Sequence, residues 1–147
     1  MNIRVSERVP TPLHLWVVGA LSLLWNAFGA FDYLATHLRL EFYMSNFSQQ
    51  QLDYFYSFPA WMSVFWALGV WGAVFGSIAL LARSRWAVGL FAVSLLGMVV
   101  STVYSLFLSD GLEVMGQEAA IFSAVIFIVA VLLLVYARRM RARGVLL

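Results

Sequence analysis

The chain has 147 residues, of which 63% are hydrophobic and only 11% are charged, and its formal net charge is +2. An average soluble domain is about 45–50% apolar and about 25% charged, so a soluble fold could not hide this much apolar surface. The composition also excludes disordered tails and nucleic-acid-binding domains, and the absence of cysteine excludes disulfide scaffolds. The class that remains is an integral membrane protein with one membrane domain over residues 1–147.

Four apolar segments are long enough to cross a bilayer core of about 30 Å, which needs about 20 residues in a helix. Open strands are excluded because their unpaired backbone groups would face hydrocarbon, and the segments are too long and too continuously apolar for the strands of a barrel. The segments cover residues 13–34, 58–82, 86–108 and 119–137. We therefore expect an all-α protein with four transmembrane helices. The first should be retained, because it is longer than the apolar core of about 7–15 residues in a signal peptide.

Asn26 is the most polar side chain placed deep within a predicted span. An unpaired amide in hydrocarbon is costly, so we expect it to hydrogen-bond a hydroxyl group of the third helix, such as Ser101 or Thr102. A bond between helices is the favoured interpretation of this residue, and a role in binding a ligand is the alternative.

The outer end of the first helix carries the other polar side chains of that span. Asp32 is the one carboxylate within a predicted span, and an acidic residue inside a membrane is a functional-site candidate. Water can reach this end of the helix, so a solvated interfacial cluster is the alternative to a proton-linked or substrate-linked site. The candidate polar site consists of Asn26, Asp32, Tyr33 and His37.

The longest stretch outside the spans, residues 35–57, joins the first two helices, and loops of this length often carry function. Ser48 and Gln51 match a capping box, with Ser48 as the N-cap and Gln51 at the third helical position. The pattern predicts a short helix over about residues 48–57, lying on the outer leaflet, where tyrosine and tryptophan favour the headgroup level. The predicted outer aromatic surface consists of Tyr43, Tyr54, Phe55 and Trp61.

The second and third helices are joined by Arg83, Ser84 and Arg85 alone, which predicts an antiparallel hairpin. Small residues recur on both helices at steps of three and four, as they do where membrane helices pack closely. We interpret them as contacts within the chain, and self-association through the Gly72–Gly76 motif is the alternative. The predicted packing residues are Gly69, Gly72, Gly76, Gly97 and Ser101.

The arginines indicate an orientation for the four helices. Eight of the nine lie at the N-terminus (Arg4 and Arg8), in the hairpin loop or at the C-terminus, whereas Arg39 lies on the opposite side. By the positive-inside rule both termini are cytoplasmic, and the helices form an antiparallel bundle. The C-terminal run should also attract anionic lipid headgroups, and it consists of Arg138, Arg139, Arg141 and Arg143.

No pattern in the sequence indicates catalysis, a metal or a cofactor. His14 and His37 are 23 positions apart. That separation is about 35 Å along a helix, so the two cannot share a metal or a haem at one depth. No carboxylate–histidine spacing matches a zinc site, and no nucleophile or phosphate-binding motif is present. We therefore expect a non-enzymatic protein without a cofactor or metal.

The sequence contains the strings Trp25–Tyr33, Phe55–Trp61, Ala67–Gly76, Ser109–Gly111 and Val135–Met140. Together they resemble a group of small four-helix bacterial inner-membrane proteins, some of which are labelled sugar transporters. The resemblance covers nearly the whole chain. It implies an inner-membrane location, and it implies no activity and no functional residues.

Three functions are consistent with these observations. The leading hypothesis is a non-enzymatic protein that engages a membrane lipid or a membrane-protein partner through its outer aromatic loop. The alternative is a small-solute transporter, with sugars among its solutes, acting as a homo-oligomer because four helices leave little room for an alternating-access path. The weaker alternative is a membrane enzyme that acts on a lipid or quinone near Asp32, Tyr33 and His37.

Three observations separate these functions. A solvated cavity that reaches Asn26 favours transport, and a dry core favours binding of a lipid or partner. Convergence of Asp32 and His37 in a lipid-accessible cleft favours an enzyme.

Overall fold

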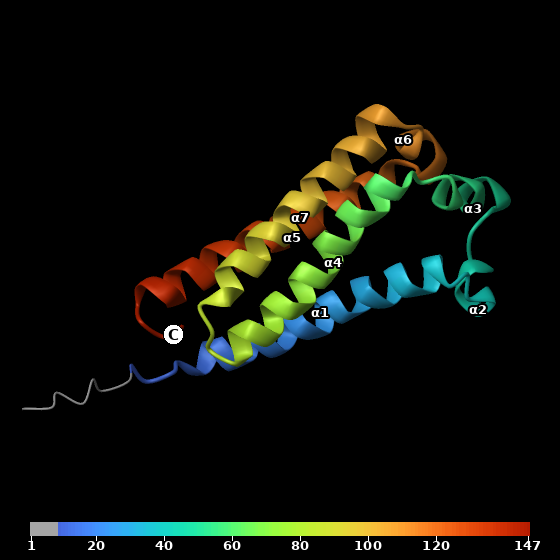
Figure 1. Cartoon of the computed structure of the whole chain (residues 1–147). Coiled ribbons are helices and arrows are strands. Elements are labelled where there is room, and N and C mark those ends of the chain that lie inside the picture. Colours follow the sequence, from blue (N-terminus) through green and yellow to red (C-terminus); the bar gives the residue numbers. More distant parts are fainter. Residues whose placement is uncertain (1–8) are drawn as a thin grey trace, which may run out of the picture.

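The computed structural model describes residues 9–147, so the predictions for Arg4 and Arg8 fall outside the described residues. All regular structure in residues 9–147 is helical. Four of these helices are long and apolar enough to cross a membrane, as the sequence predicts. The elements in chain order (Figure 1) are α1 (Leu13–His37), α2 (Glu41–Met44), α3 (Gln49–Tyr56), α4 (Ala60–Leu81), α5 (Trp86–Val103), the π-helical turn η1 (Tyr104–Leu108), α6 (Gly111–Met115) and α7 (Gln117–Ala142).

Two of the long helices extend beyond their predicted bounds, because backbone conformation ends them rather than a fall in hydropathy. α1 continues to His37, and Arg39 then adopts a left-handed conformation with a φ of 52°. α7 begins directly after Gly116, which has a φ of 85°, and ends shortly before Gly144, which has a φ of 77°. A left-handed residue cannot continue a right-handed helix. The polar end of α1 and most of the C-terminal arginines are therefore helical.

The short helix predicted between the first two spans is present as α3. The Gln51 backbone N–H donates to Ser48 Oγ at 3.2 Å, and the Ser48 backbone N–H donates to Gln51 Oε1 at 3.1 Å. These reciprocal bonds satisfy donors that the start of a helix leaves unpaired. No comparable capping bond is present at α2 or α6, and neither helix was predicted.

Successive long helices run in opposite directions and lie side by side (Figure 1). The most extensive contact joins α4 to α5, while α1 packs on α4 and α7 packs on α5. At one end the four helices enclose an apolar core, and at the other end α1 diverges from α4 (Figure 1). There residues 38–59, which we call the strap, cross between the two helices. The core residues are Leu15, Leu80, Ala87, Phe91, Leu133, Ala137, Met140, Val145 and Leu146.

Glycines allow α4 and α5 to approach at backbone distance. A Cβ atom at Gly97 would lie 2.6 Å from the backbone nitrogen of Gly69, and one at Gly72 would lie 3.1 Å from backbone atoms of α5. A Cβ atom at Gly76 would lie 2.8 Å from the ring of Phe91. The Gly72–Gly76 motif is therefore used within the chain, and its glycines are not free to pack against a second copy.

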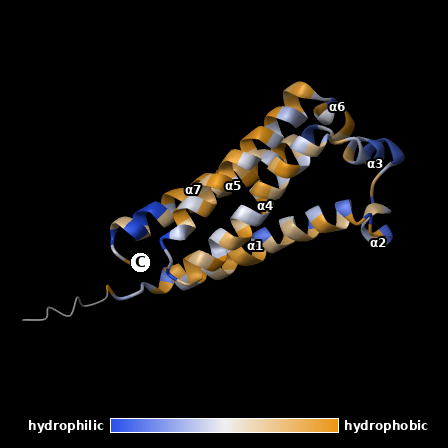
Figure 2. Ribbon diagram, viewed as in Figure 1, coloured by the Kyte–Doolittle hydropathy of each residue, from blue (hydrophilic) through white to orange (hydrophobic). Residues whose placement is uncertain are grey.

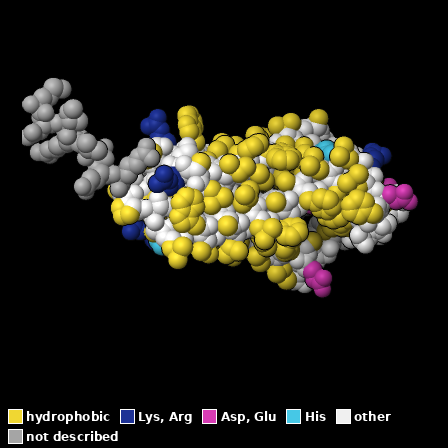
Figure 3. Space-filling view, turned by 90° about the horizontal axis from the view of Figure 1, so that it is seen from below, with side chains coloured by type: hydrophobic (Ala, Val, Ile, Leu, Met, Phe, Trp, Pro, Cys, Tyr) yellow, Lys and Arg dark blue, Asp and Glu magenta, His cyan; other side chains and the backbone are white. Residues whose placement is uncertain are grey.

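The sides of the molecule are apolar and its charges lie at the two ends. Figure 2 shows hydrophobic residues along all four long helices, and Figure 3 shows one face with most basic side chains at one end and acidic ones at the other. In the described residues the arginine end carries Arg83, Arg85, Arg138, Arg139, Arg141 and Arg143. The acidic end carries Glu41, Asp53, Asp110, Glu113 and Glu118, together with Arg39.

Candidate functional site

Asn26 forms its hydrogen bonds with α4. Its amide nitrogen donates to Ser77 Oγ at 2.9 Å and to the carbonyl oxygen of Ala73 at 3.2 Å. The expectation of a partner on the third helix is therefore wrong, because α1 packs on α4 and not on α5. Ser101, one of the expected partners, instead donates to the carbonyl oxygen of Gly97 in its own helix at 2.8 Å. Asn26 lines neither the groove along α4 nor the hollow between α6 and α7.

Asp32 connects α1 to the strap. It is half-buried, and it accepts a hydrogen bond from the hydroxyl group of Tyr43 in α2. Burial raises the pKa of the Tyr43 hydroxyl, and the hydrogen bond and the negative charge of Asp32 raise it further. Phe31 packs edge-on against the Tyr43 ring, with 5.3 Å between the ring centroids. Asp32 therefore holds the beginning of the strap against the end of α1.

Tyr33 and His37 lie one turn apart on another side of α1. Their rings stack with 4.1 Å between centroids, and both rings contact Trp66 of α4, at 5.0 and 5.1 Å. His37 Nδ1 lies 2.9 Å from the carbonyl oxygen of Tyr33. A carbonyl oxygen only accepts, so Nδ1 carries the proton and Nε2 is left to face the surroundings.

Asp32 and His37 do not converge. They are five residues apart on one helix, a rotation of about 140° around its axis. Asp32 points to the strap, whereas His37 and Tyr33 contact α4. The four predicted polar residues therefore form three separate sites: Asn26 with Ser77, Asp32 with Tyr43, and Tyr33 with His37.

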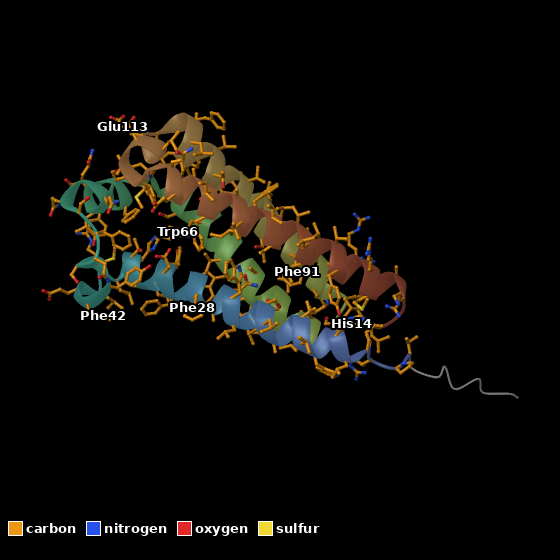
Figure 4. All side chains as sticks on the ribbon, turned by 180° about the vertical axis from the view of Figure 1, so that it is seen from behind. His14, Phe28, Phe42, Trp66, Phe91 and Glu113 are labelled. Atoms are coloured by element: carbon orange, nitrogen blue, oxygen red, sulfur yellow. The ribbon has the colours of Figure 1, made fainter. Side chains whose placement is uncertain are left out.

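Aromatic rings fill the space where α1 diverges from α4. From Trp66, which Figure 4 labels between α4 and α1, edge-to-face contacts continue through Phe58 to Tyr104 of η1 at centroid distances of 6.0 and 5.8 Å. The Tyr54 and Ser109 hydroxyl groups are 2.7 Å apart, which fastens α3 to the chain after η1. A Cβ atom at Gly111 would collide with the backbone carbonyl oxygen of Ser105, which cannot move aside, and would lie 2.6 Å from the Tyr54 hydroxyl, so glycine is required there.

The residues of the predicted outer aromatic surface are mostly only partly exposed. Tyr43, Tyr54 and Phe55 are half-buried among the contacts of the strap, and only Trp61 of the four is exposed, at 47%. The exposed rings at the acidic end also include Phe42 and Phe107, at 69% and 78%. Most aromatic side chains of the strap therefore pack within the molecule and stabilise the position of the strap.

A groove of about 710 Å³ runs along one face of α4, and of its lining residues only Tyr33, His37 and Gly72 were singled out in the sequence. Tyr33 and His37 of α1 form one wall near the acidic end, and Leu90 and Val93 of α5 line it further along. The α4 residues on its floor recur at steps of three and four, so a helical-face pattern could have indicated them. They are Ala60, Ser63, Val64, Ala67, Leu68, Trp71, Gly72 and Phe75.

The arginine end is closed by the C-terminal segment. The backbone N–H of Leu147 donates to the Arg83 carbonyl oxygen at 2.8 Å, and the Arg85 N–H donates to the Leu147 carbonyl oxygen at 3.0 Å. Val145 and Leu146 are buried between these bonds and the core. The four C-terminal arginines, Arg138, Arg139, Arg141 and Arg143, are all exposed around this closed end.

Within residues 9–147 no three His, Asp or Glu side chains are grouped closely enough to hold a metal ion. No family model, no curated protein and no solved structure matches the chain. The class of protein therefore follows from the molecule itself. Its four long apolar helices are those of a small multi-pass membrane protein.

Proposed function

We propose that this protein is a non-enzymatic inner-membrane protein that binds a membrane lipid in the groove along α4. The observation that carries the proposal is the distribution of polarity in that groove. Tyr33, His37 and Ser63 all lie toward the acidic end, and apart from the indole N–H of Trp71 the rest of the lining is aliphatic, aromatic or glycine. An amphiphile with one polar end and one apolar tail has the same distribution.

The size and the position of the groove support a lipid as the occupant. Its volume of about 710 Å³ is within the range of about 300–1,000 Å³ that is typical of ligand sites. Ala60 to Phe75 along α4 corresponds to about 22 Å of helix, more than half of a hydrocarbon core of about 30 Å. The groove opens sideways from a membrane-spanning helix, so a lipid can enter it without leaving the bilayer.

The groove also distinguishes the lipid proposal from the transporter hypothesis. Transport through this chain would need a polar path to the depth of Asn26, but the Asn26 amide bonds to Ser77 and Ala73. The apolar core, which includes the buried Val145 and Leu146, occupies the arginine end. The partner hypothesis is less favoured, because Tyr43, Tyr54 and Phe55 of the predicted aromatic surface are half-buried and Tyr43 and Tyr54 bond within the chain.

Filling the groove tests the proposal. Ala67→Phe places a ring on the groove floor, and we expect it to lower lipid occupancy about tenfold, which corresponds to about 1.4 kcal/mol of lost binding. Native mass spectrometry of the protein extracted with its lipids measures the occupancy. The control is Ala20→Phe, which adds the same ring to an exposed site of α1 outside the groove. Equal lipid occupancy in the two variants would refute the proposed site.

The proposed membrane topology is an antiparallel bundle with the arginine end in the cytoplasm and α3 lying on the outer leaflet. The positive-inside rule supports this orientation. We expect alkaline phosphatase, which is active only outside the cytoplasm, to be inactive when fused after Leu147 and active when inserted at Gln50. A cytoplasmic fluorescent reporter at the same two positions should give the opposite pattern. An active phosphatase after Leu147 would contradict the orientation.

A further inference from the structure

The polar end of the groove has hydrogen-bonding groups without protein partners. Within residues 9–147 the hydroxyl groups of Tyr33 and Ser63 make no hydrogen bond. His37 Nδ1 donates to the Tyr33 carbonyl oxygen, which leaves Nε2 of the neutral ring as an acceptor, and Nε2 makes no hydrogen bond within these residues. Elsewhere on α4 and α5, Ser77 and Ser101 donate to carbonyl oxygens of their own helices at 2.9 and 2.8 Å. A hydroxyl group without a partner in hydrocarbon costs free energy, so a ligand that accepts hydrogen bonds here is favoured.

The groove lining contains no acidic or basic side chain other than His37. A phosphate headgroup is bound most strongly by arginine or lysine. The only arginine described at the acidic end, Arg39, lies over the Tyr56 ring at 4.0 Å and does not line the groove. The lining therefore favours an uncharged headgroup.

Aromatic rings form much of the groove around these donors. Tyr33, His37 and Trp71 line it near the polar end, and Phe75 lines it further along α4. Planar rings prefer to pack on other rings in offset or edge-to-face arrangements. A planar headgroup with carbonyl oxygens would use both the rings and the hydroxyl donors. The stretch from Ser63 to Phe75, about 18 Å of helix, would hold an apolar tail.

We propose that the groove binds an isoprenoid quinone, with its ring carbonyl oxygens accepting from the Tyr33 and Ser63 hydroxyl groups. The proposal rests on the proposed function, and it names the class of lipid. The quinone is bound and not transformed, so no electron or proton transfer is involved. A phospholipid, whose charged headgroup finds no arginine or lysine in the lining, is the competing occupant.

Binding of decylubiquinone to the full chain in lipid nanodiscs tests the quinone proposal. Quenching of tryptophan fluorescence reports the binding, because Trp71 lines the groove and Trp66 adjoins it. We expect Tyr33→Phe and Ser63→Ala each to weaken binding about two- to tenfold, as the loss of one hydrogen bond does.

The control variants for this experiment are Tyr104→Phe and Ser101→Ala, whose hydroxyl groups do not line the groove. Both should bind the probe as the parent does. Equal quenching in all five proteins would mean that the probe partitions into the bilayer, which overturns the proposal. If Tyr33→Phe fails to fold, the result for Ser63→Ala decides the proposal, because Ser63 has no ring and takes no part in the aromatic packing.

The quinone proposal can be wrong while the lipid site is right, and the variants distinguish the two cases. If decylubiquinone does not bind but Ala67→Phe still releases a co-purified phospholipid, the quinone proposal is wrong and the lipid site remains. If Ala67→Phe changes neither lipid occupancy nor quenching, both proposals are wrong. If Ala67→Phe, Tyr33→Phe and Ser63→Ala all reduce the quenching, the lipid site and the quinone proposal are both supported.

Discussion

Replacing Gly97 with alanine is expected to destabilise the protein by about 2–3 kcal/mol, because the added methyl group meets backbone and not a movable side chain. A Cβ atom there would collide with the carbonyl oxygen of Phe65 and would lie 2.6 Å from the nitrogen of Gly69. The strain can be relieved only by separating α4 from α5, the most extensive helix contact in the molecule. Thermal or denaturant unfolding of the detergent-solubilised protein measures the loss.

Other glycines of the same two helices provide a graded series for this prediction. A Cβ atom at Gly72 would lie 3.1 Å from α5 and one at Gly69 would lie 3.4 Å from it, so their alanine variants should be progressively less destabilised than Gly97→Ala. Gly89→Ala is the matched control on α5, since nothing lies within 4 Å of its Cβ position. Alanine favours a helix by about 0.8–1.0 kcal/mol over glycine, so this control should be neutral or stabilised. Equal losses at Gly89 and Gly97 would contradict the packing.

The features of the fold that the sequence predicted are those set by local chemistry. The spans follow from runs of apolar residues, because hydrocarbon imposes a minimum helix length on any chain that crosses it. The start of α3 follows from Ser48 and Gln51, whose side chains bond the backbone within one turn. The helix of α7 continues past the predicted span, because the arginines lower the hydropathy while the backbone stays helical up to Ala142.

The features that the sequence did not predict depend on which helices are neighbours. Asn26 could have bonded a hydroxyl group on any adjacent helix, and only the packing of α1 on α4 selects Ser77. Nothing in the sequence indicated that α3 packs against the segment after η1, where the Tyr54 hydroxyl bonds that of Ser109. The π-helical turn had no sequence signal of its own. Ser63 was overlooked in the groove because a single serine on an apolar helix is ordinary until its neighbours on α1 are known.

Removing the Tyr43 hydroxyl group is expected to release the strap from α1. In Tyr43→Phe the half-buried Asp32 loses its partner on α2. We expect the docked state of the strap to be destabilised by about 1–2 kcal/mol, which lowers the ratio of docked to released strap by a factor of about 5–30. The chain has no cysteine, so one introduced cysteine can report the change without background. Met44→Cys places the thiol on α2 at a site that is only 4% exposed, and maleimide labelling there should accelerate by the same factor.

Two further variants separate this bond from the general packing of the strap. Tyr56→Phe removes a hydroxyl group that has no hydrogen bond in the described residues, so labelling at position 44 should stay slow. Asp32→Asn keeps an oxygen that can accept from Tyr43, so it should also stay slow. Fast labelling in Tyr56→Phe, or unchanged labelling in Tyr43→Phe, would mean that ring packing and not this bond holds the strap.

The same bond should make the strap sensitive to alkaline pH. The pKa of Tyr43 is raised from its ordinary value of 10.0 in the docked strap, by burial first and then by Asp32. A released strap would ionise near that ordinary value, whereas the docked one stays neutral to higher pH. Docking is therefore fully favoured below about pH 10 and is lost as the pH rises through the raised pKa. Labelling of Met44→Cys, corrected for ionisation of the thiol, should accelerate over this range. In the Tyr43→Phe background the acceleration should be absent, because the phenylalanine has no proton to lose.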